Sequence, residues 1–277
     1  MFGAKFKELR TAQKISLKEA AEDVVNPSSL SRWENGQTEL KFETVIELLE
    51  NIHISPLEFL SITVLTPHTP LIDEIDKAIN SSLELKRIAV RCLNIYKQQS
   101  NVDNLLNAAV ACSFYFEVSN KDIFPNEYKN VLEETFSNTF YWSRYYSLAF
   151  GCSLALLSTK TIYSFTVAFI NNIETYKEAG YENFIDIFDV ILNAYQKLIE
   201  KDVEKALQLK PKLQSIHLSF FSMYTETRRQ FLNALLLYRT TSNSAPITSI
   251  FNSLKSLKQE DLLNEFNREF RLIKHLK

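Results

Sequence analysis

The stretch NPSSLSRWENG, residues 26–36, contains the start, both faces and the end of one short helix. Asn26 is a favoured N-cap residue, and the proline after it suits the first helical position, where a missing N–H removes no hydrogen bond. Gly36 readily adopts the left-handed conformation that follows a helix end. Leu30 and Trp33 are three residues apart and therefore share one face. The sequence predicts a short helix with one apolar face and one polar face that is free to contact a partner.

Further short helices with clear start signals flank this segment. Ser16 and Glu19 have the spacing of a capping box, and Ser55 and Glu58 repeat that spacing before a fifth helix. Apolar residues that we expect the fourth and fifth helices to bury are Phe42, Val45, Ile46, Leu49, Ile52, Leu57, Phe59 and Leu60. Two short helices joined by a tight turn, within three more helices, form the helix-turn-helix arrangement, whose second helix enters the DNA major groove.

The segment ISLKEAAEDVVNPSSLSRWENGQTELKFETVIELLENIHISPLEFL, residues 15–60, resembles the phage-repressor-like (XRE) helix-turn-helix family through its SRxExG pattern and its HISPLEFL end. The ISL entry, the aromatic residue in SRWENG and the long helical remainder are more narrowly similar to the Rgg/GadR/MutR regulators of Gram-positive bacteria. This resemblance implies an all-α protein, with an N-terminal XRE domain followed by TPR-like helical repeats. It also implies a homodimer that binds a short hydrophobic peptide pheromone in quorum sensing.

The resemblance also implies roles for single residues. Those expected to contact DNA are Lys14, Lys18, Asn26, Ser28, Ser29, Arg32 and Asn35. Arg32 is the residue best suited to a bidentate contact with guanine, whereas the lysines and Asn35 would contact phosphates. Arg10 and Glu34 match positions that form a buried ion pair in this family. Leu17 departs from the wider XRE pattern, which often has Gln there, and the segment after the recognition helix has no cysteine for a bridge between two DNA-binding domains.

Charge is the main objection to a DNA-binding role, because the whole chain carries a formal net charge of −2. The first 32 residues hold six basic and four acidic side chains, whereas residues 33–65 hold six glutamates and one lysine. The basic part coincides with the first three predicted helices. Few phosphates are neutralised per copy, which favours binding as a dimer. A protein-interaction domain without DNA is the alternative.

Composition favours helices throughout, since only 4 Gly and 7 Pro occur in 277 residues. The three cysteines, Cys92, Cys112 and Cys152, lie among apolar neighbours. This predicts buried free thiols in a protein of a reducing compartment. The N-terminal segment is charged and does not resemble a signal peptide. Lys160 divides the most apolar region into runs too short to cross a bilayer. We therefore expect a cytoplasmic protein without a membrane partner.

Domain boundaries follow from prolines and from helical periodicity. Residues 1–65 are expected to form the helix-turn-helix domain, residues 66–70 a proline-containing linker, and residues 71–277 an α-helical repeat domain for ligand binding and dimerisation. A compact helical bundle is the competing architecture. The last amphipathic segment, QEDLLNEFNREFRLIKHLK, would cap the repeats or form the dimer contact.

Stacked helical repeats make grooves that hold extended peptides. Polar or aromatic residues inside otherwise apolar helices are candidates to line such a groove: Trp142, Arg144, Tyr145, Asn193, Tyr224, Arg228 and Asn233. Asn pairs with a peptide backbone through both donor and acceptor, and Arg binds carboxylates. Each of these residues also has an ordinary interpretation, either as core aromatic or as solvated cation.

No enzyme motif is present. The four histidines share no metal-ligand spacing, and neither a glycine-rich phosphate loop nor a GxSxG sequence occurs, so we expect no catalytic residues, no metal and no cofactor. The sequence predicts a transcriptional regulator that binds double-stranded DNA at an inverted-repeat operator and responds to a signalling peptide. A regulator that responds to pH or metabolic state, or a protein-binding scaffold without DNA, remains as an alternative.

Overall fold

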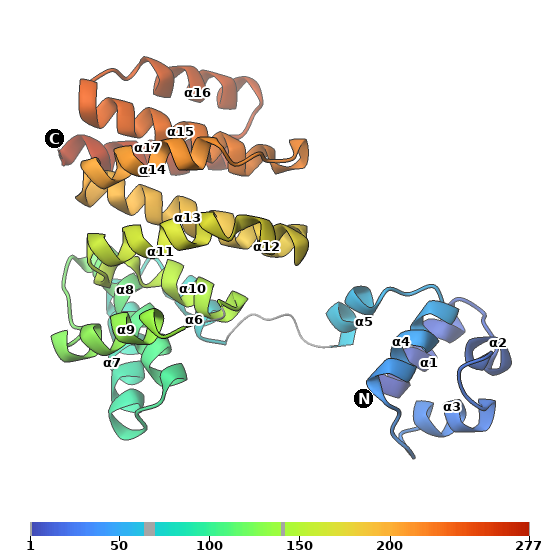
Figure 1. The fold of residues 1–277 in the computed structure, drawn as a ribbon. Coiled ribbons are helices and arrows are strands. Elements are labelled where there is room, and N and C mark those ends of the chain that lie inside the picture. Colours follow the sequence, from blue (N-terminus) through green and yellow to red (C-terminus); the bar gives the residue numbers. More distant parts are fainter. Residues whose placement is uncertain (1, 64–69, 140–141, 277) are drawn as a thin grey trace. The chain divides into compact units, whose positions relative to one another are not determined.

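The computed structural model describes residues 2–63, 70–139 and 142–276. All regular secondary structure in these ranges is helical, as the sequence predicts. The chain divides into two compact units, Met1–Asp73 and Glu74–Lys277 (Figure 1). The first unit contains α1 (Phe2–Ala12), α2 (Leu17–Ala21), α3 (Pro27–Glu34), α4 (Phe42–Asn51) and α5 (Pro56–Thr63), followed by the start of α6.

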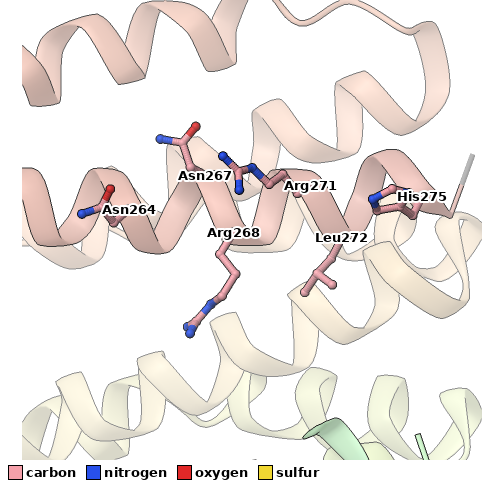
Figure 2. A pocket seen from close by; sticks show the side chains of 6 residues that line it. All are labelled: Asn264, Asn267, Arg268, Arg271, Leu272 and His275. Carbon is pink, nitrogen blue, oxygen red and sulfur yellow. The ribbon is translucent and has the colours of Figure 1, made fainter. Parts of the chain in front are cut away.

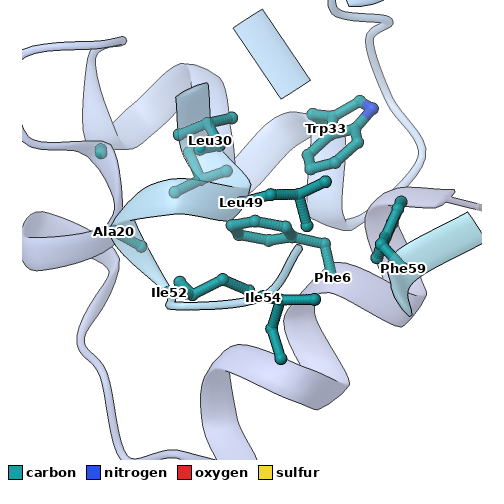
Figure 3. Packing of buried hydrophobic residues seen from close by; sticks show 10 residues of the cluster. Phe6, Ala20, Leu30, Trp33, Leu49, Ile52, Ile54 and Phe59 are labelled. Atoms are coloured by element: carbon teal, nitrogen blue, oxygen red, sulfur yellow. The ribbon is translucent and has the colours of Figure 1, made fainter. Parts of the chain in front are cut away.

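The core of the first unit forms where α1, α3 and α4 meet. Phe6, Leu30 and Leu49 are buried there, and the rings of Phe6 and Trp33 lie 5.3 Å apart (Figure 3). Gly3 brings α1 close to the backbone of α3, because a Cβ atom at this position would lie 2.2 Å from the Trp33 carbonyl oxygen. The two helices therefore contact each other backbone to backbone, and only glycine fits.

Start and stop signals of the short helices act as the sequence predicts. The Ser16 hydroxyl accepts a hydrogen bond from the Glu19 N–H, while the Glu19 carboxylate accepts one from the Ser16 N–H. Helix α3 begins at Pro27 after an extended Asn26, whose side chain makes no capping bond. Gly36 has a φ of +72°, the left-handed conformation that follows the helix end. The side chain of Asn26 is thus available for other contacts.

Three of the apolar residues expected in this core are exposed instead. Phe42 is 64% exposed, Leu57 is 70% exposed and Leu60 is 37% exposed. Side chains on a helix lean toward its N-terminus, so Phe42, the first residue of α4, points beyond the packed segment. Helix α5 packs through Phe59 and Thr63, and Leu57 and Leu60 lie on its other side. The expectation of burial was wrong at these positions.

The second unit begins within α6 and ends with α17. Its α-helices are α6 (Pro70–Ala78), α7 (Ser82–Gln98), α8 (Val102–Ser119), α9 (Asn126–Ser137), α10 (Arg144–Cys152), α11 (Thr159–Asn171), α12 (Ile173–Glu178), α13 (Tyr181–Lys201), α14 (Val203–Gln214), α15 (Met223–Thr241), α16 (Ala245–Ser256) and α17 (Glu260–His275). Two 3₁₀ turns, η1 (Leu154–Leu156) and η2 (Phe220–Ser222), lie between them. Of the expected linker, residues 66–69 lie outside the described residues.

The helices of this unit stack in two layers (Figure 1). In one layer, α8, α10, α13, α15 and α17 follow one another, and each packs against the next. Helices α7, α11, α14 and α16 pack against these from the other layer. The longest helix, α13, is central because it contacts α10, α11, α14 and α15. This arrangement makes one face of the first layer a continuous surface to which several helices contribute.

Two further expectations concern cysteines and membranes. Cys92 and Cys112 are buried and Cys152 is partly buried, all three as free thiols, and burial raises their pKa values. No helix in the described ranges combines the length and the apolar character needed to cross a bilayer. Across residues 2–63, 70–139 and 142–276, no group of three or more His, Cys, Asp and Glu side chains is arranged to hold a metal ion.

Candidate functional site

The first candidate surface is the polar face of α3. Leu30 and Trp33 turn into the core (Figure 3). Ser28 and Arg32 are exposed, and Ser29 is half-buried. The Arg32 guanidinium lies 3.4 Å from the Ser29 hydroxyl, to which it donates. Asn26 is also exposed, just before the helix. These side chains occupy the start and one side of the helix, the part that meets base edges in helix-turn-helix proteins.

A buried ion pair fixes α3 against α1. Arg10 Nε donates to Glu34 Oε1 at 2.7 Å, and Arg10 Nη2 donates to Glu34 Oε2 at 2.9 Å. The third donor, Nη1, reaches the Ile15 carbonyl oxygen at 2.7 Å. These hydrogen bonds to the Glu34 carboxylate raise the pKa of Arg10 above its usual value. This bidentate pair therefore ties together α1, the turn before α2 and the end of α3.

Basic side chains border the polar face. Lys14 and Lys18 are exposed, and Lys14 lies in the left-handed region with a φ of 61° at the corner between α1 and α2. Asn35 uses both ends of its amide within the protein, because it accepts from Lys7 Nζ at 3.0 Å and donates to the Ser31 carbonyl oxygen at 2.8 Å. Lys7 was not among the predicted contacts, although its position on the exposed side of α1 adds a cation beside the end of α3.

The second candidate surface is a polar stripe along α13. Asp186, Asp189, Asn193, Gln196 and Glu200 succeed one another at spacings of three and four residues and therefore share one helix face. Most apolar residues of α13 lie outside this stripe and are buried. The face that carries the stripe lies beside α10 on one side and α15 on the other.

Arg228 connects the stripe to α15. Its Nη2 donates to Asn193 Oδ1 at 2.6 Å and to Gln196 Oε1 at 3.3 Å, so its partners are neutral amides. Its Nε is buried and has no hydrogen-bond partner within the described protein. The neighbouring Arg229 is used structurally, because it donates to two backbone carbonyl oxygens and pairs with Glu226.

Two carboxyl groups, one partly buried and one buried, complete this cluster. Asp189 on α13 and Glu269 on α17 each have one buried oxygen without a hydrogen-bond partner among the described residues. Burial raises the pKa of Asp189, and burial raises the pKa of Glu269 to about 7. The charge of Arg228 acts in the opposite direction on both. These groups stand around Tyr224, whose pKa is raised by burial and also responds to the charges of Arg228, Asp189 and Glu269.

An open pocket lies along α17. Its lining residues are Asn264, Asn267, Arg268, Arg271, Leu272 and His275 (Figure 2). Arg268 and Leu272 point to the same side of the helix in Figure 2, while Asn267 and Arg271 point elsewhere. The charge of Arg268 slightly favours the ionised form of Glu269, which places this cation near the cluster.

We call Asp189, Asn193, Gln196, Tyr224, Arg228 and Glu269 the acidic cluster.

The structure separates the seven sequence-derived groove candidates. Asn193, Tyr224 and Arg228 belong to the acidic cluster. Arg144 pairs with Asp186 at the start of the stripe on α13, and Tyr145 is 37% exposed beside Asp103.

The other two candidates are used in packing. Trp142 lies among Phe136, Phe150, Phe165 and Phe169, with its ring 4.8 Å from that of Phe169. Asn233 accepts a hydrogen bond from the buried Tyr195 hydroxyl at 3.0 Å.

Sequence reasoning missed the carboxyl groups. Asp189 and Glu269 were not candidates, because a single acid on a helix is usually solvated. The signal was the regular polar spacing within the apolar α13, and the i, i+4 spacing of Glu265 and Glu269 in α17.

Comparisons with known proteins match both parts of the chain to known families. Residues 6–59 match the helix-turn-helix family, and residues 91–268 match the family described as the C-terminal domain of the HTH-type transcriptional regulator Rgg. No relative was found among curated proteins. Because the matched family consists of transcriptional regulators, the expectation that the chain is not an enzyme is confirmed.

Solved structures with the same fold cover almost the whole chain. The SHP pheromone receptor Rgg2 of Streptococcus dysgalactiae is 16% identical, with a TM-score of 0.76 over 98% of this chain and 99% of that chain. The PrgX/cCF10 complex is 12% identical, with a TM-score of 0.72 over 100% of this chain and 93% of that chain. A bacterial peptide pheromone–receptor complex is 13% identical, with a TM-score of 0.71 over 99% and 98%. The Rgg C-terminal domain family matches more than half of this chain. The chain therefore belongs to the Rgg family of helix-turn-helix transcriptional regulators.

Proposed function

We propose that this regulator is a homodimer that binds an inverted-repeat operator and responds to a short hydrophobic signalling peptide. Residues 1–65 would bind DNA, residues 66–70 would link the two parts, and residues 71–277 would bind the peptide and hold the dimer together. Its place of action would be the cytoplasm, where it meets DNA. The acidic cluster is the observation that carries the peptide part of this proposal.

The DNA part is supported by the geometry of α3. The helix presents Asn26, Ser28 and Arg32 to solvent, while the buried Arg10–Glu34 pair holds its orientation. Arg32 would donate two hydrogen bonds to a guanine, and Lys14 and Lys18 would contact the phosphates on either side. Asn35 would contribute through Lys7, to which it is hydrogen-bonded, rather than alone.

Exposed apolar side chains in the first unit support a second dimer contact, in addition to the one proposed for residues 71–277. Phe42, Leu57 and Leu60 are each more than a third exposed, although all three are large and apolar. A second copy covering such residues would remove them from water. A symmetric pair of recognition helices would then require two half-sites in inverted orientation.

The peptide part is supported by buried polar groups that lack partners. Protein interiors satisfy nearly all buried polar atoms, and an unsatisfied one costs about 1–3 kcal/mol. The cluster leaves one oxygen of Asp189, one oxygen of Glu269 and the Nε of Arg228 unsatisfied. A peptide backbone, which has alternating donors and acceptors, would supply such partners. The structural neighbours include receptors solved with peptide pheromones.

Peptide binding would act on DNA binding by population shift. A ligand moves an equilibrium between two arrangements of a dimer only by its difference in affinity for them. A peptide that bridges α13, α15 and α17 would favour the arrangement in which these helices stand closest. The spacing of the two recognition helices would then match the operator in one state and not in the other.

Selection of bound sequences from random duplex DNA tests the first part. Wild type should enrich an inverted repeat, and Arg32→Ala should lose discrimination at one base pair of each half-site by about 10- to 100-fold. Arg87→Ala, which removes an exposed cation from α7 in the second unit, is the matched control and should enrich the wild-type sequence. An Arg32→Ala protein with unchanged specificity would contradict the assignment of Arg32, and no enrichment by wild type at low salt, with or without peptide, would contradict operator binding.

A response to pH is the second candidate function, and Glu269 favours it. Its pKa of about 7 means that the charge of the acidic cluster changes near neutrality. Operator binding measured at pH 6 and pH 8, without any peptide, distinguishes the two. A large change that Glu269→Gln abolishes would favour a pH sensor, whereas no change would leave the peptide as the signal.

A further inference from the structure

The acidic cluster contains more negative charge than its neighbours neutralise. Within the described ranges, neither Asp189 nor Glu269 takes part in an ion pair, although each has a buried oxygen free of hydrogen bonds. Arg228 is the nearest cation that influences both, and its Nη2 donates to Asn193 and Gln196 instead. Its charge is shared between two carboxyl groups without a direct contact to either.

The surrounding charges do not make up the difference. Asp186 and Glu200 are on the same helix face, but Asp186 already pairs with Arg144, and Glu200 shares Lys197 with Glu117. Glu265 on α17 adds another negative charge beside Glu269. Arg268, on the pocket side of α17, is exposed and lowers the pKa of Glu269 only weakly.

Burial makes this arrangement costly without a partner. Glu269 is 8% exposed and Arg228 is 8% exposed, so little water screens their charges. A buried carboxylate that lacks a counter-ion is destabilising, and an opposite charge placed against it removes most of that penalty. A backbone N–H would satisfy one oxygen but would leave the charge in place. An ammonium or guanidinium group would satisfy the oxygens and the charge together.

We infer that the peptide bound at this site presents a cationic group, either its free N-terminal amine or a lysine or arginine side chain, to the carboxylates of Asp189 and Glu269. The inference rests on the proposed peptide-binding function and specifies its ligand. Arg228 donates to Asn193 and Gln196 and, within the described residues, forms no ion pair with either carboxylate, so the cation of the peptide takes that place. The hydrophobic remainder of the peptide lies along the face of the same layer.

Affinity selection from synthetic random octapeptides tests the chemistry. The full-length protein is incubated with four libraries, in which the N-terminus is free or acetylated and Lys, Arg and His are present or absent, and bound peptides are read by mass spectrometry. Wild type should enrich peptides from at least one library that offers a free amine or basic residues, and none from the acetylated library that lacks basic residues. Enrichment from the free-amine library without basic residues identifies the N-terminus as the cation, and enrichment from the acetylated library with them identifies a side chain.

Charge-neutral variants test the location. Asp189→Asn/Glu269→Gln keeps the shapes and should weaken an enriched peptide at least tenfold. The matched control, Glu204→Gln/Glu260→Gln, removes the same formal charge from exposed positions and should bind like wild type. If the double variant unfolds, Glu269→Gln alone is measured and should still weaken binding several-fold.

The outcomes separate the inference from the function on which it rests. If wild type binds acetylated peptides without basic residues as tightly as the others, the cationic group is refuted while peptide binding stands. Unchanged affinity in the folded double variant refutes the placement at Asp189 and Glu269. If wild type enriches no peptide from any library, the proposed peptide function itself fails, and the inference fails with it.

Discussion

Replacing Glu269 by glutamine should remove a pH dependence from the stability of the second unit. Glu269 is buried between α15 and α17, one of its oxygens lacks a partner, and burial is the main reason that its pKa rises from 4.5 to about 7. Glu265 and Glu200 add to the rise, whereas Arg228 and Arg268 oppose it. The native protein therefore binds this proton more tightly than the unfolded chain does.

The sign and size follow from proton linkage. Stability due to a raised carboxyl pKa is present at low pH and is lost as pH rises through the native pKa. The charged form costs about 3 kcal/mol at alkaline pH, since each pKa unit corresponds to about 1.4 kcal/mol. Between pH 8 and pH 5.5 the free energy of unfolding of wild type should rise by about 2 kcal/mol more than that of Glu269→Gln. At pH 8 the variant should be the more stable protein.

Urea denaturation followed by tryptophan fluorescence measures this difference. Trp33 lies in the first unit and Trp142 in the second, so a Trp33→Phe background reports on the second unit alone. Protein concentration is held constant, because dimer formation would otherwise shift the apparent stability. Glu260→Gln, at an exposed position on the same helix, is the control and should follow wild type at each pH. Parallel pH profiles for wild type and Glu269→Gln would refute the argument that burial of this carboxyl governs the profile.

Three further substitutions test contacts described above, each by urea denaturation. Glu34→Gln should destabilise the first unit by about 3–5 kcal/mol, because Arg10 is left buried without its counter-ion. The control Glu8→Gln breaks only an exposed pair with Lys5 and should cost under about 0.5 kcal/mol. Equal effects of the two substitutions would contradict a stabilising role of the buried ion pair. Gly3→Ala should cost at least about 1–3 kcal/mol, since the added methyl group would meet the Trp33 backbone, and a neutral effect would show that α1 and α3 are not in backbone contact. Tyr195→Phe should lower the free energy of unfolding by about 1–3 kcal/mol, because Asn233 loses its hydrogen-bond donor. Adding Asn233→Leu should recover part of this stability. No recovery would mean that the Tyr195→Phe effect comes from packing and not from the hydrogen bond.

Local chemistry made the first unit predictable from its sequence. Ser16 and Glu19 cap α2 with their own side chains, and Gly36 ends α3 through its own backbone, so neither depends on distant residues. Burial was less predictable. Phe42 and Leu57 have the periodicity of core residues but stand at the first turns of α4 and α5, where no neighbouring helix in the unit reaches them. Periodicity shows that residues share a face and does not show whether anything covers it.

The candidate ligand site was predictable only in part. Asn193 and Arg228 could be found as polar residues within apolar helices, but their direct contact depends on the parallel packing of α13 and α15, which the sequence does not reveal. Trp142 was expected in a groove and packs among phenylalanines from α9, α10 and α11 instead. Glu269 lies 80 residues after Asp189 in the chain, and only the stacking of three helices brings both near Tyr224.

Helices in the middle of the two-layer stack form more interfaces with their neighbours than helices at its end do. Helix α13 contacts neighbours on several sides, whereas the main contacts of α17 are with α15 and α16. In such a stack, detaching an end element breaks few interfaces, while opening the middle breaks many. Amide hydrogens of α13 should therefore exchange with solvent more slowly than those of α16 and α17. Since Glu269 lies on α17, an end helix of the stack supplies one wall of the acidic cluster, and transient fraying of that helix would admit a ligand without disturbing the rest of the stack.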